Sequence, residues 1–217
     1  MNKLSPQARR NRLAMQAREA LFLRHGYDSA ASLAFALAQA LPLTGHVLEI
    51  GTGRGRFLGA LAKHATRVTT VDVDKAQQRA AKLYVRQTHA GHPIRFVLHD
   101  AEQLPWPDAS FDAVVSMNTF HHLARPMRVF NEMMRIVQPG GKLALGDFSP
   151  RGFQNFDRIH RLEGRRHPRL KDGLTEFACT LRMAGWKTRR SKGCNQEMLV
   201  ATAPATAPRP APKSVAS

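Results

Sequence analysis

Short apolar runs alternate with amphipathic runs over most of this chain. Runs rich in β-branched residues predict five strands, at residues 47–50, 68–73, 94–98, 111–116 and 142–148. Apolar positions with helical spacing predict helices starting at residue 57 and spanning residues 75–89 and 127–137. Strands that alternate with helices are typical of parallel βαβ units, so the pattern favours an open α/β sheet.

The two ends of the chain follow other patterns. Residues 186–202 predict two more strands around a turn near residues 193–195, and such a short link requires antiparallel pairing. Residues 1–45 predict two helices, one starting at Ser5-Pro6 and one over residues 29–40. Residues 204–217 are rich in alanine and proline and predict a disordered tail. We therefore expect a helical segment (1–45), one α/β domain (46–203) and a tail.

The composition fits a single domain with a full core. A chain of 217 residues with 43% hydrophobic residues is ordinary for a globular protein. Its two cysteines form neither a disulfide framework nor a zinc-site pattern, so we predict no metal and a reduced, cytoplasmic location. The longest apolar stretch, residues 30–43, is too short to span a bilayer, and no secretory signal follows the basic N-terminus. The sequence leaves the oligomeric state open.

The net charge of +17 is unusual, and much of it is concentrated in one segment. Residues 151–192 contain twelve Lys/Arg and four Asp/Glu. A basic face attracts RNA, anionic lipid or an acidic small molecule, but surface arginines also simply keep a domain soluble. Because aromatic RNA-binding motifs are absent, nucleic-acid binding is the less favoured interpretation.

Residues 47–57, VLEIGTGRGRF, are the most informative segment. A strand runs into a glycine-rich turn that allows a ligand close to the backbone, and a helix N-terminus with free amides follows. The spacing is G-x-G-x-G, and Arg56 stands where a dinucleotide-binding motif has its third glycine. Glu49 precedes the first glycine and suits a cationic ligand better than a pyrophosphate. The turn therefore predicts a nucleotide-type ligand that carries positive charge.

Two more carboxylates are expected at the ends of the next strands. Asp72 follows the glycine turn by about twenty residues, where a carboxylate accepts both hydroxyls of a ribose. Asp100 ends the third strand and can accept from an exocyclic adenine amine, while Ala101 offers a backbone amide. Together with Glu49, these acids end three successive strands. Because open α/β sheets bind ligands at these strand ends, the three predict one site.

The segments 47–55, 71–74, 100–112 (DAEQLPWPDASFD) and 137–141 (VQPGG) resemble class I S-adenosylmethionine-dependent methyltransferases. The resemblance is to the ubiquinone/menaquinone-methyltransferase-like group (methyltransferase type 11) and covers residues 47 to about 148. It implies a Rossmann-like, seven-stranded α/β sheet, mostly parallel with an antiparallel C-terminal hairpin, and helices on both faces. It also implies S-adenosyl-L-methionine as cofactor. The implied cofactor-binding residues are Glu49, Gly51, Thr52, Gly53, Gly55, Asp72, Val73, Asp100, Ala101, Ser116, Met117 and Asn118.

His121 and His122 follow the fourth strand and are the candidate catalytic residues. A histidine pair here can orient or deprotonate an acceptor, although one ring can also simply satisfy a helix end. Methyltransferases that act on amino groups of nucleic-acid bases often carry an Asn/Asp-Pro-Pro-aromatic motif at this point. Its absence disfavours methylation of a base nitrogen.

A second polar cluster follows the fifth strand and supplies candidate substrate contacts. These candidates are Asp147, His160, Glu163, Arg166 and His167. On a helix, residues 160, 163 and 167 share one face. A salt-linked surface is the favoured interpretation of that face, ahead of substrate contact and of metal ligation.

The sequence therefore predicts a single-domain methyltransferase whose first 45 residues form a lid. We expect a small-molecule acceptor. The alternatives are an RNA methyltransferase, or a non-catalytic cofactor-binding protein that uses its basic face for RNA or a protein partner. An intact glycine turn with all three strand-end acids favours catalysis.

Overall fold

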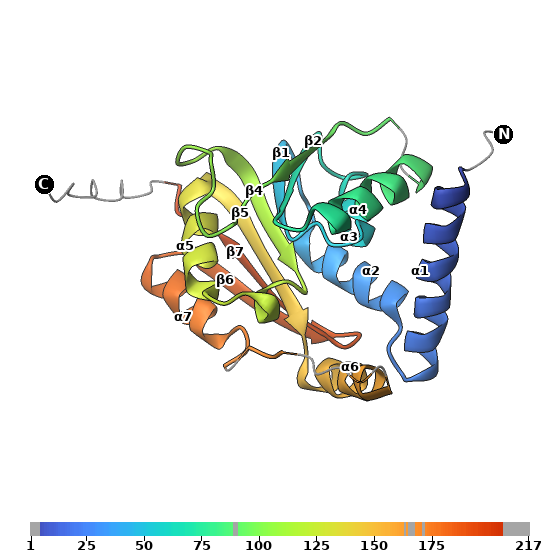
Figure 1. The fold of residues 1–217 in the computed structure, drawn as a ribbon. Helices are drawn as coiled ribbons and strands as arrows, with labels where there is room; N and C mark the ends of the chain where they lie inside the picture. The colour runs from blue at the N-terminus through green and yellow to red at the C-terminus, as the bar shows by residue number, and fades with distance from the viewer. Residues whose placement is uncertain (1–4, 89–90, 163, 165–167, 171, 206–217) are drawn as a thin grey trace, which may run out of the picture.

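A central seven-stranded sheet organises the protein (Figure 1). The computed structural model describes residues 5–88, 91–162, 164, 168–170 and 172–205. The strands are β1 (His46–Ile50), β2 (Arg67–Asp72), β3 (Ile94–Leu98), β4 (Phe111–Met117), β5 (Val137–Phe148), β6 (Lys187–Gly193) and β7 (Gln196–Thr202). Their order is β3-β2-β1-β4-β5-β7-β6, and β1 to β5 pair in parallel. β7 pairs antiparallel with β6, as the short link between them predicted, and it also pairs antiparallel with β5.

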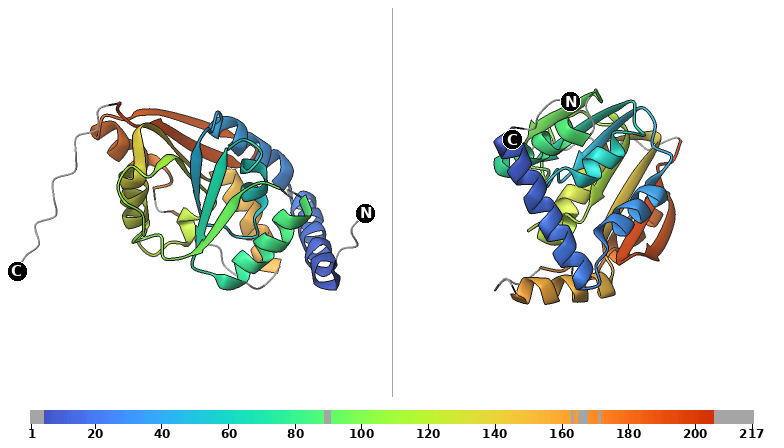
Figure 2. Two further views of the ribbon diagram at one scale, coloured as in Figure 1. Left: turned by 90° about the horizontal axis from the view of Figure 1, so that it is seen from above. Right: turned by 90° about the vertical axis from the view of Figure 1, so that its right-hand side faces the viewer.

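Helices cover both faces of this sheet (Figures 1 and 2). The helical elements are α1 (Pro6–Arg24), α2 (Ser29–Ala40), α3 (Arg56–Leu61), α4 (Lys75–Thr88), the 3₁₀ turn η1 (Phe120–His122), α5 (Pro126–Ile136), α6 (Pro150–Leu162) and α7 (Thr175–Met183). The core on one face contains residues of α2, α3 and α4, and the core on the other contains residues of α5 and α7. The predicted fold class is confirmed.

The two cores explain the continuous apolar runs of the central strands. Side chains alternate between the faces of a strand, so Val47 joins the α2–α3–α4 core while Leu48 joins the α5–α7 core. Both residues are completely buried. A strand covered on both sides needs apolar residues at every position, which is the pattern of parallel sheets. The order of the strands reverses between β1 and β4, and their carboxyl ends lie side by side.

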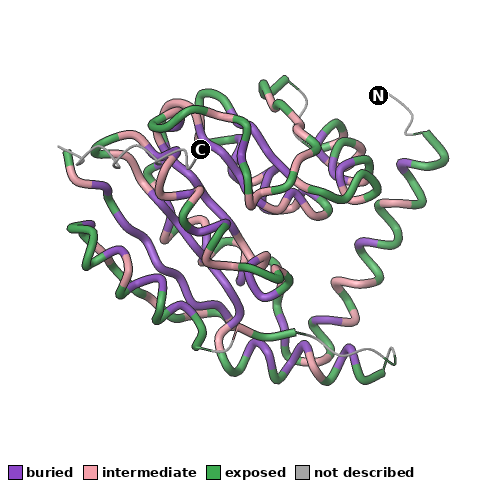
Figure 3. Tube along the Cα trace, turned by 60° about the vertical axis from the view of Figure 1, so that its left-hand side comes forward, coloured by how far each residue is buried: buried purple, intermediate pink, exposed green. Residues whose placement is uncertain are grey.

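The two N-terminal helices are attached in different ways. α2 buries Ala36 and Ala40 against the sheet and belongs to its covering layer. α1 buries Ala8, Met15 and Phe22, a single stripe with seven-residue spacing, and most of its other residues are exposed (Figure 3). Figure 2 shows α1 at the periphery of the molecule. The lid role stays a prediction, and α1 is the part of residues 1–45 to which it applies.

Some local features differ from the prediction. The chain forms the 3₁₀ turn η1 directly after β4, and it forms α7, which the sequence analysis did not predict. β5 begins at Val137, so the VQPGG segment belongs to the strand. Residues 206–217 of the predicted tail lie outside the described residues. Within the described ranges, no helix has the length and hydropathy needed to span a bilayer.

Candidate active site

The glycine turn links β1 to α3 and requires glycine on steric grounds. Gly51 and Gly55 have φ values of +87° and +80°, in the left-handed region that favours glycine. A Cβ on Gly51 would overlap the side chain of Thr119, and one on Gly55 would come within 2.9 Å of Ala81 Cβ. The backbone of the turn is therefore packed closely against Thr119, which follows β4, and against α4. The predicted strand–turn–helix arrangement is confirmed.

Glu49 lies beside this turn and is only 1% exposed. The Thr70 hydroxyl donates to Glu49 Oε2 at 2.6 Å, and Thr70 Oγ1 lies 2.7 Å from Thr52 Oγ1. Because Thr70 has a single proton, Thr52 must be the donor in the second bond. Burial raises the pKa of Glu49 to about 8; the Thr70 bond opposes this rise and the Asp72 carboxylate adds to it. A cation beside Glu49 would favour the ionised form, so the side chain is suited to a positively charged ligand.

The other two strand-end acids take different positions. Asp72 Oδ2 accepts from the Gly53 amide at 3.0 Å, which ties the end of β2 to the glycine turn. Asp100 lies beyond the end of β3, is exposed, and accepts from the Glu102 amide at 2.9 Å. Ala101 beside it is half-buried, and Val73 after Asp72 is exposed. These residues lie at the carboxyl ends of β2 and β3.

The end of β4 brings a second set of groups to the turn. The Ser116 hydroxyl donates to the Ile50 carbonyl at 2.9 Å, so this side chain joins β4 to β1 inside the sheet. Asn118 follows with φ +52°, a conformation that asparagine tolerates better than most residues. Its Oδ1 atom is buried, and no described residue donates a hydrogen bond to it. An orphaned acceptor in this position points to a ligand or to water.

His121, His122 and Asp147 form a hydrogen-bonded chain. His121 Nδ1 lies 2.6 Å from Asp147 Oδ1, and His121 Nε2 lies 3.0 Å from His122 Nε2. His121 is 4% exposed and Asp147 is 2% exposed. His122, at the other end of the hydrogen-bonded chain, is exposed to solvent. Partial desolvation lowers the pKa of His122 to about 4, and charge on His121 or His160 adds to the effect while Asp147 opposes it. His122 is therefore neutral at physiological pH.

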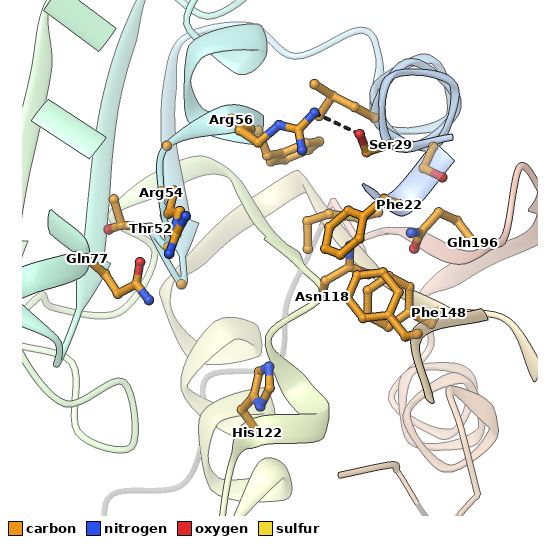
Figure 4. Close-up of a pocket in the computed structure, with 18 of the residues that line it drawn as sticks. Phe22, Ser29, Thr52, Arg54, Arg56, Gln77, Asn118, His122, Phe148 and Gln196 are labelled. Carbon is orange, nitrogen blue, oxygen red and sulfur yellow. Dashed lines mark hydrogen bonds between the residues drawn. The ribbon is translucent and has the colours of Figure 1, made fainter. Parts of the chain in front are cut away.

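One cavity of about 350 Å³ joins these groups (Figure 4). The predicted residues that line it are Glu49, Gly51, Thr52, Gly53, Gly55, Met117, Asn118, His121 and His122. The predicted residues that lie outside its lining are Asp72, Val73, Asp100, Ala101, Ser116, Asp147 and His160. Five of the residues outside the lining were predicted to bind the cofactor: Asp72, Val73, Asp100, Ala101 and Ser116. Their cofactor role stays a prediction, because the cavity lining does not test it.

The far wall of the cavity comes from parts of the chain that the sequence analysis did not assign to it. Phe22, Tyr27, Phe148 and Phe156 pack together, with Tyr27 edge-on to each of the other three rings. Gln196 donates from Nε2 to the Tyr27 hydroxyl at 2.9 Å and is completely buried. These aromatic residues give this side of the cavity a largely apolar surface. The sequence analysis did not identify these residues because they are far apart in the sequence and form no local motif.

Arg56 connects the cavity lining to the two N-terminal helices. Arg56 forms an ion pair with Glu19 of α1 at 2.7 Å and donates to Ser29 Oγ of α2 at 3.0 Å (Figure 4). Arg18 of α1 also lines the cavity and lies 4.8 Å above the Phe22 ring. Arg56, which takes the place of a dinucleotide motif's third glycine, thus links the turn to α1.

The cluster after β5 differs from its prediction. His160 is 7% exposed and packs edge-on against Phe156, so the interpretation as a salt-linked surface is wrong for this residue. Its buried position follows from the apolar face of α6, which includes Phe153, Phe156 and Ile159. Glu163, Arg166 and His167 lie outside the described residues. Asp147 points at His121 instead of lining the cavity.

The fold agrees with the one that the sequence resemblance implies. It has a seven-stranded sheet with an antiparallel β7 beside β5, and a glycine turn after β1. Residues 48–145 match the family described as "Methyltransferase domain". The match covers 98 of the 217 residues, and it confirms the resemblance inferred from the sequence.

Related proteins of known name cover part of the same region. The 27-O-demethylrifamycin SV methyltransferase of Amycolatopsis mediterranei is 34% identical over 148 residues, covering 61% of this chain and 54% of the relative. The demethylmenaquinone methyltransferase of Deinococcus radiodurans is 36% identical over 116 residues, covering 54% and 48%. The chain thus spans about half the length of these relatives.

Solved structures share the fold at lower identity. A SAM-dependent methyltransferase from Aquifex aeolicus superposes with a TM-score of 0.60 at 22% identity, over 79% of this chain and 89% of that one. The [4+2]-cyclase SpnF superposes with a TM-score of 0.62 at 20% identity, over 80% and 81%. Since a cyclase shares the fold, the fold alone does not define the reaction.

Proposed function

We propose that this chain transfers a methyl group from S-adenosylmethionine to a small organic molecule. The observation that carries this proposal is that one cavity contains both the glycine turn with Glu49 and the exposed end of the His122–His121–Asp147 chain. The aromatic wall opposite provides apolar area for an organic acceptor. The names of the two relatives above each specify a small organic molecule, which supports an acceptor of this kind.

The residues at the turn fit the cofactor on structural grounds. Apart from Gly53 and its two chain neighbours, no described residue has a heavy atom within 4 Å of the position that a Cβ on Gly53 would take, so the backbone there is open to a ligand. Glu49 offers a carboxyl group suited to a cation, and Asn118 offers a buried acceptor. Asp72 and Asp100, at the ends of β2 and β3, are the proposed contacts for the ribose and the adenine.

When bound, the cofactor supplies an electrophilic methyl group to an attacking acceptor atom. The task of the protein is then mainly to hold the two reactants in line and to exclude water. Phe22, Tyr27 and Phe148 provide a dry surface for the acceptor. His122 lies on the same cavity and, being neutral, is able to accept a proton from the acceptor.

The basic face gives less support to an RNA substrate than its charge suggests. Arg189 of β6 donates to the Gln39 carbonyl oxygen at 2.8 Å, and Arg190 pairs with Glu197. Both side chains therefore hold β6 to its neighbours. An RNA acceptor and a non-catalytic partner-binding role remain alternatives for the experiment.

Two measurements test the proposal. Calorimetry should detect binding of S-adenosylmethionine but no comparable binding of NAD. Asp72→Ala should weaken cofactor binding by about 1.5–3 kcal/mol, the range for a charge-assisted hydrogen bond. Unchanged affinity in a folded variant would remove Asp72 from the cofactor site.

The acceptor is found by incubating the protein with methyl-labelled cofactor and a cell extract separated into small molecules, RNA and protein. We expect label in the small-molecule fraction, and much less with Asp72→Ala. Label in RNA would support the RNA alternative. No label in any fraction, with cofactor binding intact, would support a non-catalytic protein.

A further inference from the structure

One buried polar atom on the aromatic side of the cavity lacks a hydrogen-bond donor. Gln196, the first residue of β7, is completely buried and lines the cavity. Its Nε2 atom donates to the Tyr27 hydroxyl at 2.9 Å, whereas its buried Oε1 atom receives no hydrogen bond from the part of the chain that the structure describes. Buried polar atoms are almost always paired in folded proteins, so an unpaired one in a cavity lining indicates a ligand or a water.

The hydrogen bonds of Tyr27 determine which end of the Gln196 amide is left unpaired. The Ser32 hydroxyl donates to the Cys194 carbonyl at 2.5 Å, so the Ser32 oxygen is able to accept in turn. The Ser32 side chain also hydrogen-bonds with the Tyr27 hydroxyl, which has a single proton to donate. That proton goes to Ser32, so the Tyr27 oxygen is the acceptor for Gln196 and the amide must present Nε2 to it. The unpaired atom is therefore Oε1, an acceptor.

Tyr27 is held firmly enough to orient this amide. It is 4% exposed and packs edge-on against three phenylalanine rings of the aromatic wall. The carbonyl of Gly26 before it accepts from Asn155 Nδ2 of α6 at 2.9 Å and from Asn195 Nδ2 of the β6–β7 turn at 3.3 Å. Since Tyr27 is fixed by these contacts, its bond to Gln196 opposes rotation of the amide and keeps Oε1 in place.

The charges around the cavity disfavour a cationic donor at this end. Three arginines line the cavity, and Glu49 is the only acid among its described lining residues. Burial raises the pKa of Tyr27, and the charge of Arg56 is among the effects that oppose this rise, although Arg56 also pairs with Glu19. The positive charge therefore extends to the Tyr27 hydroxyl. An ammonium group there would be repelled, whereas an uncharged O–H or N–H group would not.

We infer that the acceptor carries an uncharged hydrogen-bond donor, an alcohol hydroxyl or an amide N–H, which Gln196 Oε1 receives beside the aromatic wall. This inference rests on the proposed function and adds a recognition feature of the acceptor to it. Gln196 is then a specificity-determining residue, and Tyr27 is the positioning residue that orients it. Because the surrounding surface is aromatic, the donor belongs to an otherwise apolar part of the acceptor.

The position of Gln196 separates this contact from the proposed cofactor site. Figure 4 shows Gln196, Phe22 and Phe148 on one side of the cavity and Thr52 and Gln77 on the other. The amide end of Gln196 points from β7 toward the cavity. A donor bound to Gln196 therefore leaves the glycine turn free for the cofactor, so the subsite can be tested with a cofactor product bound.

Binding of small aromatic probes tests the subsite before the acceptor is known. The probes are benzyl alcohol and benzamide, each compared with a methylated analogue that lacks the donor, benzyl methyl ether or N,N-dimethylbenzamide. With S-adenosylhomocysteine present, NMR titration should show at least one donor binding about 10-fold or more tightly than its analogue and shifting the Gln196 side-chain amide signals. The pair with the larger ratio identifies the preferred donor, hydroxyl or amide.

Gln196→Met keeps the length of the side chain but removes its acceptor, so the affinity ratio within each pair should fall to about 1. Gln78→Met is the matched control: Gln78 is 5% exposed, donates to the Val97 carbonyl at 2.6 Å and lies outside the cavity lining. This control should keep the ratio. Tyr27→Phe should reduce the ratio because it releases the amide.

Two results of the titrations would overturn the inference. Equal affinities within both pairs in the wild-type protein would mean that Gln196 Oε1 pairs with an ordered water only. A ratio that survives Gln196→Met would mean that another group reads the donor. The wild-type comparison decides the question even where Gln196→Met does not fold.

Turnover provides the second test once the labelled product has been isolated. Gln196→Met should lower kcat/KM for the acceptor by about 10- to 100-fold, mainly through a higher KM, while its affinity for S-adenosylhomocysteine is unchanged. An acceptor analogue without the donor should lose as much with the wild-type protein and nothing further with Gln196→Met, because both changes remove the same hydrogen bond. A normal KM in folded Gln196→Met would overturn the recognition role.

The two levels of the proposal fail in different ways. If S-adenosylhomocysteine does not bind, or if no fraction of the extract takes up label, the proposed function fails, and probe titrations without it still report on Gln196. If label is transferred and Gln196→Met keeps the KM of the wild-type protein, only the recognition feature of the acceptor fails.

Discussion

Replacing Glu49 by Gln should make the ligand-free protein more stable and its cofactor binding weaker. Glu49 is 1% exposed, and its pKa is raised from 4.5 to about 8 by burial. Between pH 4.5 and 8 the Glu49 carboxyl group is ionised in the unfolded chain but protonated in the folded protein. The stability of the folded state therefore falls as pH rises from 4.5, and the loss is complete above about 8.

The magnitude follows from the same linkage. In the unfolded chain the Glu49 carboxyl group has its ordinary pKa, and pH 7 lies about 2.5 units above that value. Keeping the buried group protonated at pH 7 therefore costs the folded state roughly 3 kcal/mol of stability. Gln has nearly the same shape, accepts from Thr70 in the same way and never ionises. Glu49→Gln should thus raise the free energy of unfolding at pH 7 by up to about 3 kcal/mol, and the gain should shrink toward pH 5. Urea unfolding at a series of pH values measures it.

Cofactor binding supplies the complementary measurement. If the cofactor binds with its cationic amino group beside Glu49, that charge would favour the carboxylate, so binding at pH 6–7.5 should release a proton. Calorimetry in buffers of different ionisation enthalpy counts that proton. Glu49→Gln should release none and should bind about 10- to 100-fold more weakly, the loss of one charge-assisted hydrogen bond. A variant that is less stable than wild type at pH 7, or that still releases the proton, would refute this account.

Two further perturbations probe the opposite side of the cavity. Tyr27→Phe keeps the aromatic packing but removes the acceptor for Gln196 Nε2, so the free energy of unfolding should fall by about 1–3 kcal/mol; unchanged urea unfolding would show that the amide finds another partner. His122 has a pKa lowered from 6.5 to about 4, so the folded state loses stability as pH falls through this window. His122→Gln should flatten the pH dependence of unfolding between pH 6.5 and 4, and an unchanged slope would mean that His122 titrates normally.

The sequence predicted most of the sheet because the physical signals there are local. The parallel strands contain short apolar runs, β1 is followed by Gly51, and β2 ends at Asp72. Ser5 and Asp28 cap α1 and α2 with hydrogen bonds at 3.2 Å and 2.9 Å, and both residue types are typical N-caps. The pairing of β6 with β7 followed from the length of their link alone.

The cavity's far wall was not predictable in the same way. Tyr27 and Gln196 are separated by 169 residues and meet only because β7 inserts beside β5. No periodicity in either segment specifies that contact. α7 was missed because its nine residues give too short a pattern to be recognised as helical.

The pairing of His121 with Asp147 lies between these two cases. His121 follows the end of β4 and Asp147 is the last but one residue of β5; the two strands are parallel neighbours with Met117 opposite Gly146. Once two consecutive strands are taken as adjacent, side chains near their carboxyl ends are expected to meet. The sequence analysis placed Asp147 among substrate contacts because it treated each strand end separately. Register between neighbouring strands, more than residue type, would have identified its partner.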